Sequence, residues 1–334
     1  MSDSSTNVRT GQGADGRRIK VALLDDYQDV ARSMGDWSRL SDRVDLAFYT
    51  ERIEDREELV RELEPCEVVV AMRERTPFPR DLIERLPNLR LLITTGPHNK
   101  SFDWAALRDA NIPVSATRFR LAPTVEITWA LILACSRYLV QEDRRMREGG
   151  WQETVGFELA RRTLGLVGLG GMGQLMVPIA KAFDMNVIAW SQNLDRGKAA
   201  ALGVEAVSKE RLFADADFIS IHLVLSDRSQ GLIGAADLER MKRSAFLVNT
   251  SRGPIVQEKA LVDALQNGWI AGAGLDVYDV EPLPADHPLR TLSNVTLSPH
   301  IGFVSHDQYV MWYADIIENI ESYLSGQPIR LIDH

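Results

Sequence analysis

The sequence is poor in cysteine, with two in 334 residues. Two cysteines cannot build a disulfide framework, so the chain is not a small disulfide-rich secreted domain. Cys66 precedes the apolar run "EVVVAM", and Cys135 lies within "ALILACSRYLV". Because both neighbourhoods are apolar, we expect both thiols to be buried for packing and unreactive.

Long hydrophobic runs are also missing. No apolar run approaches the roughly eighteen residues that cross a bilayer, and "MSDSSTNVRTGQGADGRR" at the start has no apolar core of a secretory signal. We therefore expect residues 1–17 to form a flexible tail, and the protein to be cytoplasmic without a membrane partner.

Positive charge is scarce as well. The 38 Lys and Arg residues are outnumbered by 47 Asp and Glu, which gives a net charge of −9, and no Lys/Arg run stands out. This composition argues against a nucleic-acid partner. No spacing of Cys, His and carboxylates suggests a metal site.

From Lys20 onward the sequence alternates short apolar runs with amphipathic segments. The segments "DREELVRELE" and "PRDLIERL" have helical spacing. The apolar runs have the length and continuity of buried parallel strands; they are "KVALLDD", "VDLAFYT", "EVVVAM", "LRLLITT" and "IPVSAT". Alternation of this kind predicts an α/β fold with a doubly wound parallel sheet.

A long helical segment follows, "TVEITWALILACSRYLVQEDRRMREG", which we expect Thr124 to cap after Pro123. Its apolar face is wider than one small domain needs. The helix either contacts a second subunit or forms a buried spine.

A second alternating series predicts another doubly wound sheet, built from "TLGLVGLG", "NVIAWS", "DFISIHL", "AFLVNTS", "AGAGLDVY" and "NVTLSPH". The last helical segment, "SHDQYVMWYADIIENIESYLSG", should return to the first domain because the second sheet is complete without it. The predicted domains are residues 18–121 plus 303–334, and residues 122–302. Two crossings between them predict a hinge and a ligand-binding cleft.

The run "VGLGGMG" predicts a dinucleotide site. It places Gly168, Gly170 and Gly173 in the G-x-G-x-x-G pattern, after an apolar strand and at the start of a helix. The first glycine allows the tight turn, the second admits the pyrophosphate and the third lets helix and strand pack closely. Free N–H groups around Met172 should face the phosphates.

Three strand ends in the second series carry unusual polar residues: Arg252 after "FLVNTS", Glu281 after "LDVYDV" and His300 after "TLSP". Ligands of open α/β sheets bind beyond the carboxyl ends of strands. Arg252 can grip a carboxylate, His300 can exchange a proton, and Glu281 can orient the imidazole and favour its charged form. Each residue alone could be an ordinary surface or loop residue, but together they suit reversible oxidation of a secondary alcohol beside a carboxylate.

The motifs "GLVGLGGMG", "FLVNTSRG", "GLDVYDVEP" and "SPHIG", in this order, resemble the D-isomer-specific 2-hydroxyacid dehydrogenases from Lys20 to Leu331. The resemblance implies two Rossmann-like domains: a discontinuous, flavodoxin-like substrate domain and a central coenzyme domain that builds a homodimer. It implies that Arg252 binds substrate, that Glu281 is the acidic partner and that His300 is the acid/base. It also leads us to expect no C-terminal regulatory extension of the kind found in long phosphoglycerate dehydrogenases.

The expected cofactor contacts are Gly168, Gly170, Met172, Gly173, Ser191, His222, Thr250 and Asp276. In such families the loop "TTGPHNKSFD" offers backbone N–H groups to the substrate carboxylate, so we expect Thr95, Gly96 and Pro97 at the substrate together with Arg252. This loop is longer than the usual form, and we interpret His98 as a polar loop residue. Arg118 and Arg120 could meet a second anionic group of the substrate, although we favour surface salt bridges for both.

Ser191 stands where an acidic residue usually binds the adenosine ribose. Serine removes the repulsion of a 2′-phosphate, Asn193 and Arg196 could contact one, and Asp195 is expected to cap the next helix. Both NAD and NADP are therefore acceptable. Two other functions stay open: a formate- or phosphite-type dehydrogenase, and a non-catalytic dinucleotide sensor or corepressor on the same fold.

Overall fold

The computed structural model describes residues 18–332, so the predicted tail 1–17 lies outside the described residues, as do residues 333–334. The chain divides into two compact units. Unit 1 comprises the described parts of Met1–Arg120 and His306–His334, and unit 2 is Leu121–Ser305. Each unit contains one parallel sheet with helices packed against it, so the predicted fold class is confirmed.

The sheet of unit 1 has five strands in the order β2-β1-β3-β4-β5, and every pairing is parallel. This is the flavodoxin-like order. Its strands are β1 (Ile19–Leu23), β2 (Val44–Phe48), β3 (Val68–Ala71), β4 (Leu91–Thr94) and β5 (Val114–Ser115). All residues of β3 and β4 are buried, which explains their continuous apolar sequences.

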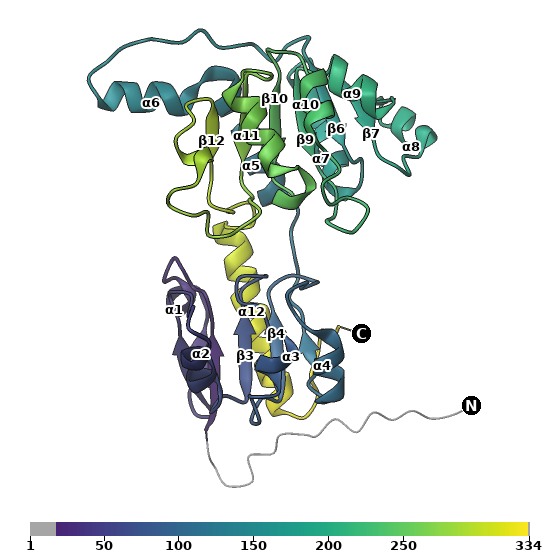
Figure 1. The fold of residues 1–334 in the computed structure, drawn as a ribbon. Coiled ribbons are helices and arrows are strands. Elements are labelled where there is room, and N and C mark those ends of the chain that lie inside the picture. Colours follow the sequence, from purple (N-terminus) through teal and green to yellow (C-terminus); the bar gives the residue numbers. More distant parts are fainter. Residues whose placement is uncertain (1–17, 333–334) are drawn as a thin grey trace. The chain divides into compact units, whose positions relative to one another are not determined.

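Helix α12 (His306–Leu324) belongs to unit 1 although it comes last in the chain. Figure 1 shows it in yellow beside β3 and β4. Trp312 is fully buried and its indole N–H donates to the Arg118 carbonyl at 2.8 Å. The other helices of this unit are α1 (Ala31–Met34), η1 (Trp37–Leu40), α2 (Arg56–Leu63), α3 (Arg80–Ile83) and α4 (Trp104–Asp109).

The sheet of unit 2 has seven parallel strands in the order β12-β11-β10-β9-β6-β7-β8. They are β6 (Thr163–Val167), β7 (Asn186–Trp190), β8 (Glu205–Ala206), β9 (Phe218–Ile221), β10 (Phe246–Asn249), β11 (Gly272–Leu275) and β12 (Val295–Leu297). Two apolar clusters bury its central strands. The helices are α7 (Gly171–Ala182), α8 (Arg196–Ala201), α9 (Lys209–Asp215), α10 (Ala235–Arg240), α11 (Glu258–Gln266), η2 (Gly253–Ile255) and η3 (Pro288–Arg290).

The predicted long helix is interrupted, which corrects the sequence-based expectation. It forms α5 (Ala122–Arg137) and α6 (Leu139–Arg147), because Tyr138 adopts a left-handed conformation with φ 53°. Thr124 is not the N-cap either. The helix begins at Ala122 with Pro123 in its first turn, and the Thr124 hydroxyl donates to the Gly302 carbonyl at 2.9 Å.

Both cysteines are free and buried, as predicted. Burial raises the pKa of the Cys66 thiol to about 11 and that of Cys135 to about 12, so neither forms a thiolate readily. Within residues 18–332 no helix has the length and apolar character needed to cross a bilayer.

Candidate active site

The glycine loop follows the central strand of unit 2 directly. Strand β6 ends at the fully buried Val167, and Gly168 turns with φ 103°. A Cβ at Gly168 would meet the His222 carbonyl at 2.6 Å, and one at Gly173 would overlap the Gly168 carbonyl. By contrast, a Cβ at Gly170 would meet nothing within 4 Å. The first and third glycines therefore allow close packing, whereas the second leaves open space beside the backbone.

Helix α7 begins immediately after this open space, at Gly171. The first N–H groups of a helix have no acceptor within it, so those of Gly171, Met172 and Gly173 can meet an anion. Open space, a helix N-terminus and a tight turn fit the pyrophosphate of a dinucleotide.

Ser191 lies beside this loop. Strand β7 pairs with β6, and the Gly168 N–H donates to the Trp190 carbonyl at 2.8 Å. The Asp195 carboxylate does not replace the missing acidic residue. Its Oδ1 accepts from the N–H groups of Gly197 at 2.9 Å and Lys198 at 3.0 Å. The expectation that Asp195 caps the next helix is thus confirmed, and these bonds lower its pKa.

His300 and Glu281 meet beyond neighbouring strands β11 and β12. His300 Nδ1 lies 2.5 Å from Glu281 Oε2, while Glu281 Oε1 accepts from the Tyr278 N–H at 2.9 Å. These hydrogen bonds fix the pair. The His300 and Glu281 side chains are 27% and 34% exposed, so a ligand can reach them. His300 has φ 53°, a left-handed conformation that only local support can stabilise.

Arg252 follows β10, the strand that pairs with β11. The Asn249 side-chain amide donates to the Arg252 carbonyl at 2.9 Å, and Arg252 Nη1 donates to the Ser251 carbonyl at 2.8 Å. Because β10, β11 and β12 are adjacent and parallel, Arg252, Glu281 and His300 follow the same edge of one sheet.

Asp276 is buried directly after β11, and its carboxylate holds the segment around His300. Oδ1 accepts from the Ile301 N–H at 2.9 Å and from the Ser298 hydroxyl at 2.5 Å. Oδ2 accepts from the Gly302 N–H at 2.8 Å. Burial raises the pKa of Asp276, and these hydrogen bonds oppose that effect. The sequence predicted only a cofactor contact and missed this support, because two of the three donors are backbone N–H groups and all three lie 22 to 26 residues further along the chain.

His222 and Thr250 have protein partners. The His222 ring lies 2.9 Å from the Ser220 hydroxyl, and burial lowers the pKa of His222 to about 4, so the ring is neutral near pH 7. The hydroxyls of Thr250 and Thr128 are 2.7 Å apart. In this structure Thr250 therefore ties β10 to α5.

The predicted substrate loop lies in unit 1, directly after β4. The Thr95 N–H donates to the Ala71 carbonyl at 3.2 Å, and the Gly96 N–H donates to the Thr117 hydroxyl at 2.7 Å. Pro97 has no N–H. These three residues therefore offer no backbone donor to a substrate in this structure, which leaves the N–H of His98.

Arg73 and Arg75 follow β3, next to this loop, and were missed by the sequence analysis. Arg73 Nη1 donates to the Thr95 carbonyl at 3.0 Å. Arg75 Nη1 donates to the Asp25 carbonyl at 2.6 Å, with its guanidinium 4.1 Å from the Tyr27 ring centroid. The sequence could have pointed to both arginines, because "MRERT" directly follows a buried strand.

Arg118 and Arg120 form salt bridges, as favoured from the sequence. Arg118 Nη2 lies 2.7 Å from Asp315 Oδ1, whose side chain is fully buried. Arg120 Nη1 lies 3.3 Å from Asp307 Oδ2. Both arginines thus connect the end of the first segment of unit 1 to α12.

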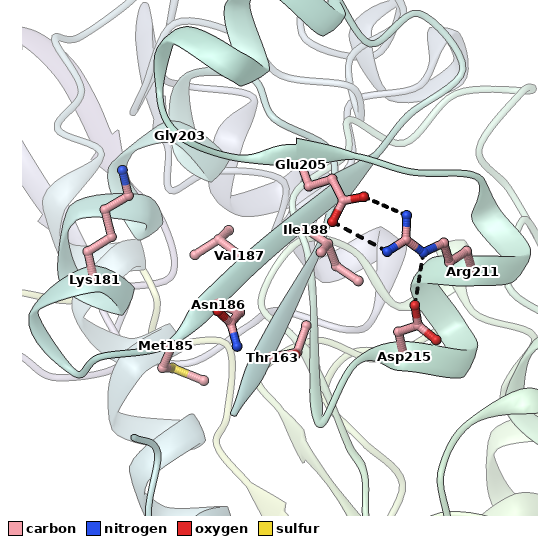
Figure 2. Close-up of a pocket in the computed structure, with 10 residues that line it drawn as sticks. All are labelled: Thr163, Lys181, Met185, Asn186, Val187, Ile188, Gly203, Glu205, Arg211 and Asp215. Carbon is pink, nitrogen blue, oxygen red and sulfur yellow. Dashed lines mark hydrogen bonds and ion pairs between the residues drawn. The ribbon is translucent and has the colours of Figure 1, made fainter. Parts of the chain in front are cut away.

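The amino ends of β6 and β7 border a separate hollow of about 420 Å³. Figure 2 shows Lys181 on one side and Arg211 on the other, where Arg211 is bonded to Glu205 and Asp215. The glycine loop follows the opposite end of β6, so this hollow is not the dinucleotide site. Between residues 18 and 332, no group of three or more His, Cys, Asp or Glu side chains could hold a metal ion.

Comparison with known proteins agrees with this geometry. Residues 129–302 match the family model described as D-isomer specific 2-hydroxyacid dehydrogenase, NAD binding domain. The chain is 35% identical to a glyoxylate reductase of Korarchaeum cryptofilum, over 82% of this chain and 85% of that protein. It also resembles the crystal structure of a phosphoglycerate oxidoreductase from Vibrio cholerae o395, with 35% identity, a TM-score of 0.87, and coverage of 92% and 99%.

A second similar structure is an acyclic imino acid reductase in complex with NADPH and D-Arg. It has 27% identity, a TM-score of 0.74, and coverage of 94% of this chain and 100% of that one.

The chain belongs to the D-isomer-specific 2-hydroxyacid dehydrogenase family. It is an oxidoreductase that acts on hydroxy acids and contains the NAD-binding domain of that family.

Proposed function

We propose that this enzyme reduces small 2-oxo acids to D-2-hydroxy acids, with His300 as the acid, Glu281 as its partner and Arg252 as the group that binds the substrate carboxylate. The observation that carries this assignment is the 2.5 Å contact between His300 Nδ1 and Glu281 Oε2. The naming of the relative from Korarchaeum cryptofilum as a glyoxylate reductase favours glyoxylate and other short 2-oxo acids as substrates.

The contact with Glu281 determines which atom of His300 carries the reacting proton. Since Nδ1 is engaged by the carboxylate, Nε2 is the atom that faces the substrate oxygen. The negative charge of Glu281 lies against the ring while Nε2 holds the proton that it transfers. In reduction, Nε2 gives its proton to the carbonyl oxygen, and in oxidation it takes the proton from the hydroxyl.

Arg252 positions the substrate relative to that proton. Its planar guanidinium can form two parallel hydrogen bonds with a carboxylate, which fixes the direction of the neighbouring carbonyl. The loop that follows β4 would add the His98 N–H. In this proposal unit 1 is the substrate domain and unit 2 the coenzyme domain.

When bound, the nicotinamide supplies or accepts the hydride. Gly168, Gly170, Met172 and Gly173 would hold the pyrophosphate, and Ser191 would meet the adenosine ribose. Asp276 supports the part of the site where the reaction takes place, because its carboxylate binds the segment that carries His300.

We further propose a cytoplasmic homodimer formed through unit 2. Helix α6 has no buried residue, and apolar side chains on and after it are exposed, with Leu139 at 61%, Trp151 at 71% and Val155 at 90%. A second subunit would remove this surface from water. Two buried, free thiols suit a reducing compartment.

The test is the rate of NADH and NADPH oxidation with glyoxylate and with hydroxypyruvate, for the wild type and for Glu281→Gln. Turnover of at least one acid, with the high-pH limb of the variant displaced to lower pH, supports the assignment. Cofactor binding without turnover of any 2-oxo acid would instead favour the sensor function. Turnover with formate or phosphite alone would favour that branch.

A further inference from the structure

The stretch from Asp279 to Arg290 carries Glu281, and most of it is exposed. Its only regular element is the short η3. Three side chains of this stretch are at least partly buried: Leu283, His287 and Leu289. The two leucines pack on the apolar cluster of unit 2, whereas His287 is polar and titratable. One of the three inward side chains of the stretch that carries Glu281 is therefore an imidazole.

His287 joins this stretch to a regular helix. Its Nε2 lies 3.1 Å from Oε1 of Glu258, the first residue of α11. Its Nδ1 accepts from the Leu289 N–H at 3.3 Å. Because an N–H must donate, Nδ1 carries no proton, and the proton on Nε2 points at the Glu258 carboxylate. The His287 and Glu258 side chains are 14% and 29% exposed, so water screens this bond only partly.

The backbone at the beginning of the stretch packs closely against the residue that follows Arg252. A Cβ at Gly253 would overlap the Tyr278 carbonyl carbon and lie 2.6 Å from the Asp279 nitrogen, so the backbone rests on the residue after Arg252. The Asp279 carboxylate also interacts electrostatically with Glu258 and His287. Burial raises its pKa, the Glu258 charge adds to that rise, and His287 opposes it. The charged groups that face His287 are thus Glu258 from α11 and Asp279 from its own stretch.

We propose that His287, held by Glu258, is a positioning residue that keeps Glu281 against His300. This inference rests on the roles proposed above for His300 and Glu281. The stretch is fixed near Tyr278 at one end and at His287 at the other, with Glu281 between them. Since the contact between His300 and Glu281 is short, a displacement of about 1 Å at Glu281 lowers the rate substantially without removing any reacting group.

The test compares His287→Leu, which keeps bulk but removes both hydrogen bonds, with His287→Gln, which keeps an N–H donor for Glu258. His306→Leu is the matched control, because His306 is 74% exposed and lies in unit 1. The readout is the pH profile of kcat/KM for glyoxylate reduction. We expect His287→Leu to lower kcat/KM about tenfold and to move the high-pH limb to lower pH. His287→Gln should recover most of both, and His306→Leu should change neither.

A double variant separates positioning from general damage. In a Glu281→Gln background, His287→Leu should add little, because the carboxylate that it positions is already gone. Full additivity would overturn the inference, and so would an unmoved profile in His287→Leu when Glu281→Gln moves it. If Glu281→Gln itself leaves the profile unchanged, the proposed pair with His300 fails instead. Should His287→Leu not fold, Glu258→Gln tests the same bond from α11 and must move the limb in the same direction.

Discussion

Asp276 Oδ2 accepts a hydrogen bond from the backbone N–H of Gly302 at 2.8 Å, two residues beyond the proposed acid His300. Its other oxygen accepts from the Ile301 N–H. A buried carboxylate thus stabilises the left-handed backbone at His300, with φ 53°. Support of this kind compensates for a conformation that costs roughly 1 kcal/mol or more outside glycine.

Asp276→Asn should therefore reduce turnover. The carboxamide has an NH2 group in place of one carboxylate oxygen, so one of the N–H groups of Ile301 and Gly302 would face a donor in the present geometry, and the segment with His300 must shift. We expect kcat for 2-oxo acid reduction to fall about 10- to 100-fold, with the fold retained by circular dichroism. Asp286→Asn, an exposed change in unit 2, is the control. Equal kcat in wild type and Asp276→Asn would show that the clamp is not needed.

Acid should destabilise unit 2 through His222. Its pKa is about 4 in the folded chain and 6.5 in the reference state, so the unfolded chain binds the proton first. The stabilising contribution is present above pH 6.5 and is lost as the pH falls to about 4. At about 1.4 kcal/mol per pKa unit, the loss is at most about 3.5 kcal/mol.

Urea unfolding at near-neutral and acidic pH checks this expectation. His222→Gln, which can still bond the Ser220 hydroxyl, should show a smaller loss on acidification, while the exposed His306→Gln should behave as wild type. The same pH dependence in His222→Gln and wild type would mean that His222 is not the responsible group.

Arg252→Lys should damage substrate binding, because an ammonium cannot reproduce a bidentate fork. Losing one charge-assisted hydrogen bond corresponds to about a 10- to 100-fold decrease in kcat/KM. Arg120→Lys serves as the matched control, since Arg120 is half exposed and pairs with Asp307. An unchanged kcat/KM for Arg252→Lys would assign Arg252 a structural role.

Ser191→Asp should weaken NADPH far more than NADH. The new carboxylate would repel a 2′-phosphate and could accept hydrogen bonds from the ribose, whereas Asp195 is already committed to α8. The measurement is the ratio of kcat/KM for the two cofactors before and after the change. If the wild type rejects NADPH as strongly as the variant does, another group excludes the phosphate.

The sequence predicts the architecture well, for a physical reason. Parallel strands buried on both faces, such as β3 and β4, leave continuous apolar runs, and the edge of the sheet follows from where those runs end. Arg252, Glu281 and His300 could be proposed from the sequence because each follows such an end. The break at Tyr138 could not, since one left-handed residue leaves the helical spacing of its neighbours intact.

Other features depend on which backbone groups are already engaged. The occupied N–H groups of Thr95 and Gly96 leave no trace in composition or spacing. Neither does the pairing of Asp276 with Gly302, nor that of His287 with Glu258, because the partners are far apart in the chain. The sequence shows which residues are polar, and only the fold shows which groups they bind.

The most direct test of the proposed chemistry is His300→Ala, assayed for both turnover and cofactor binding, with His306→Ala as control. Removing the proton donor should lower kcat for 2-oxo acid reduction about 10²- to 10⁴-fold. The Kd for NADH should stay nearly unchanged, since the glycine loop is untouched. Equal turnover in His300→Ala and wild type would contradict the assignment of His300 as the acid.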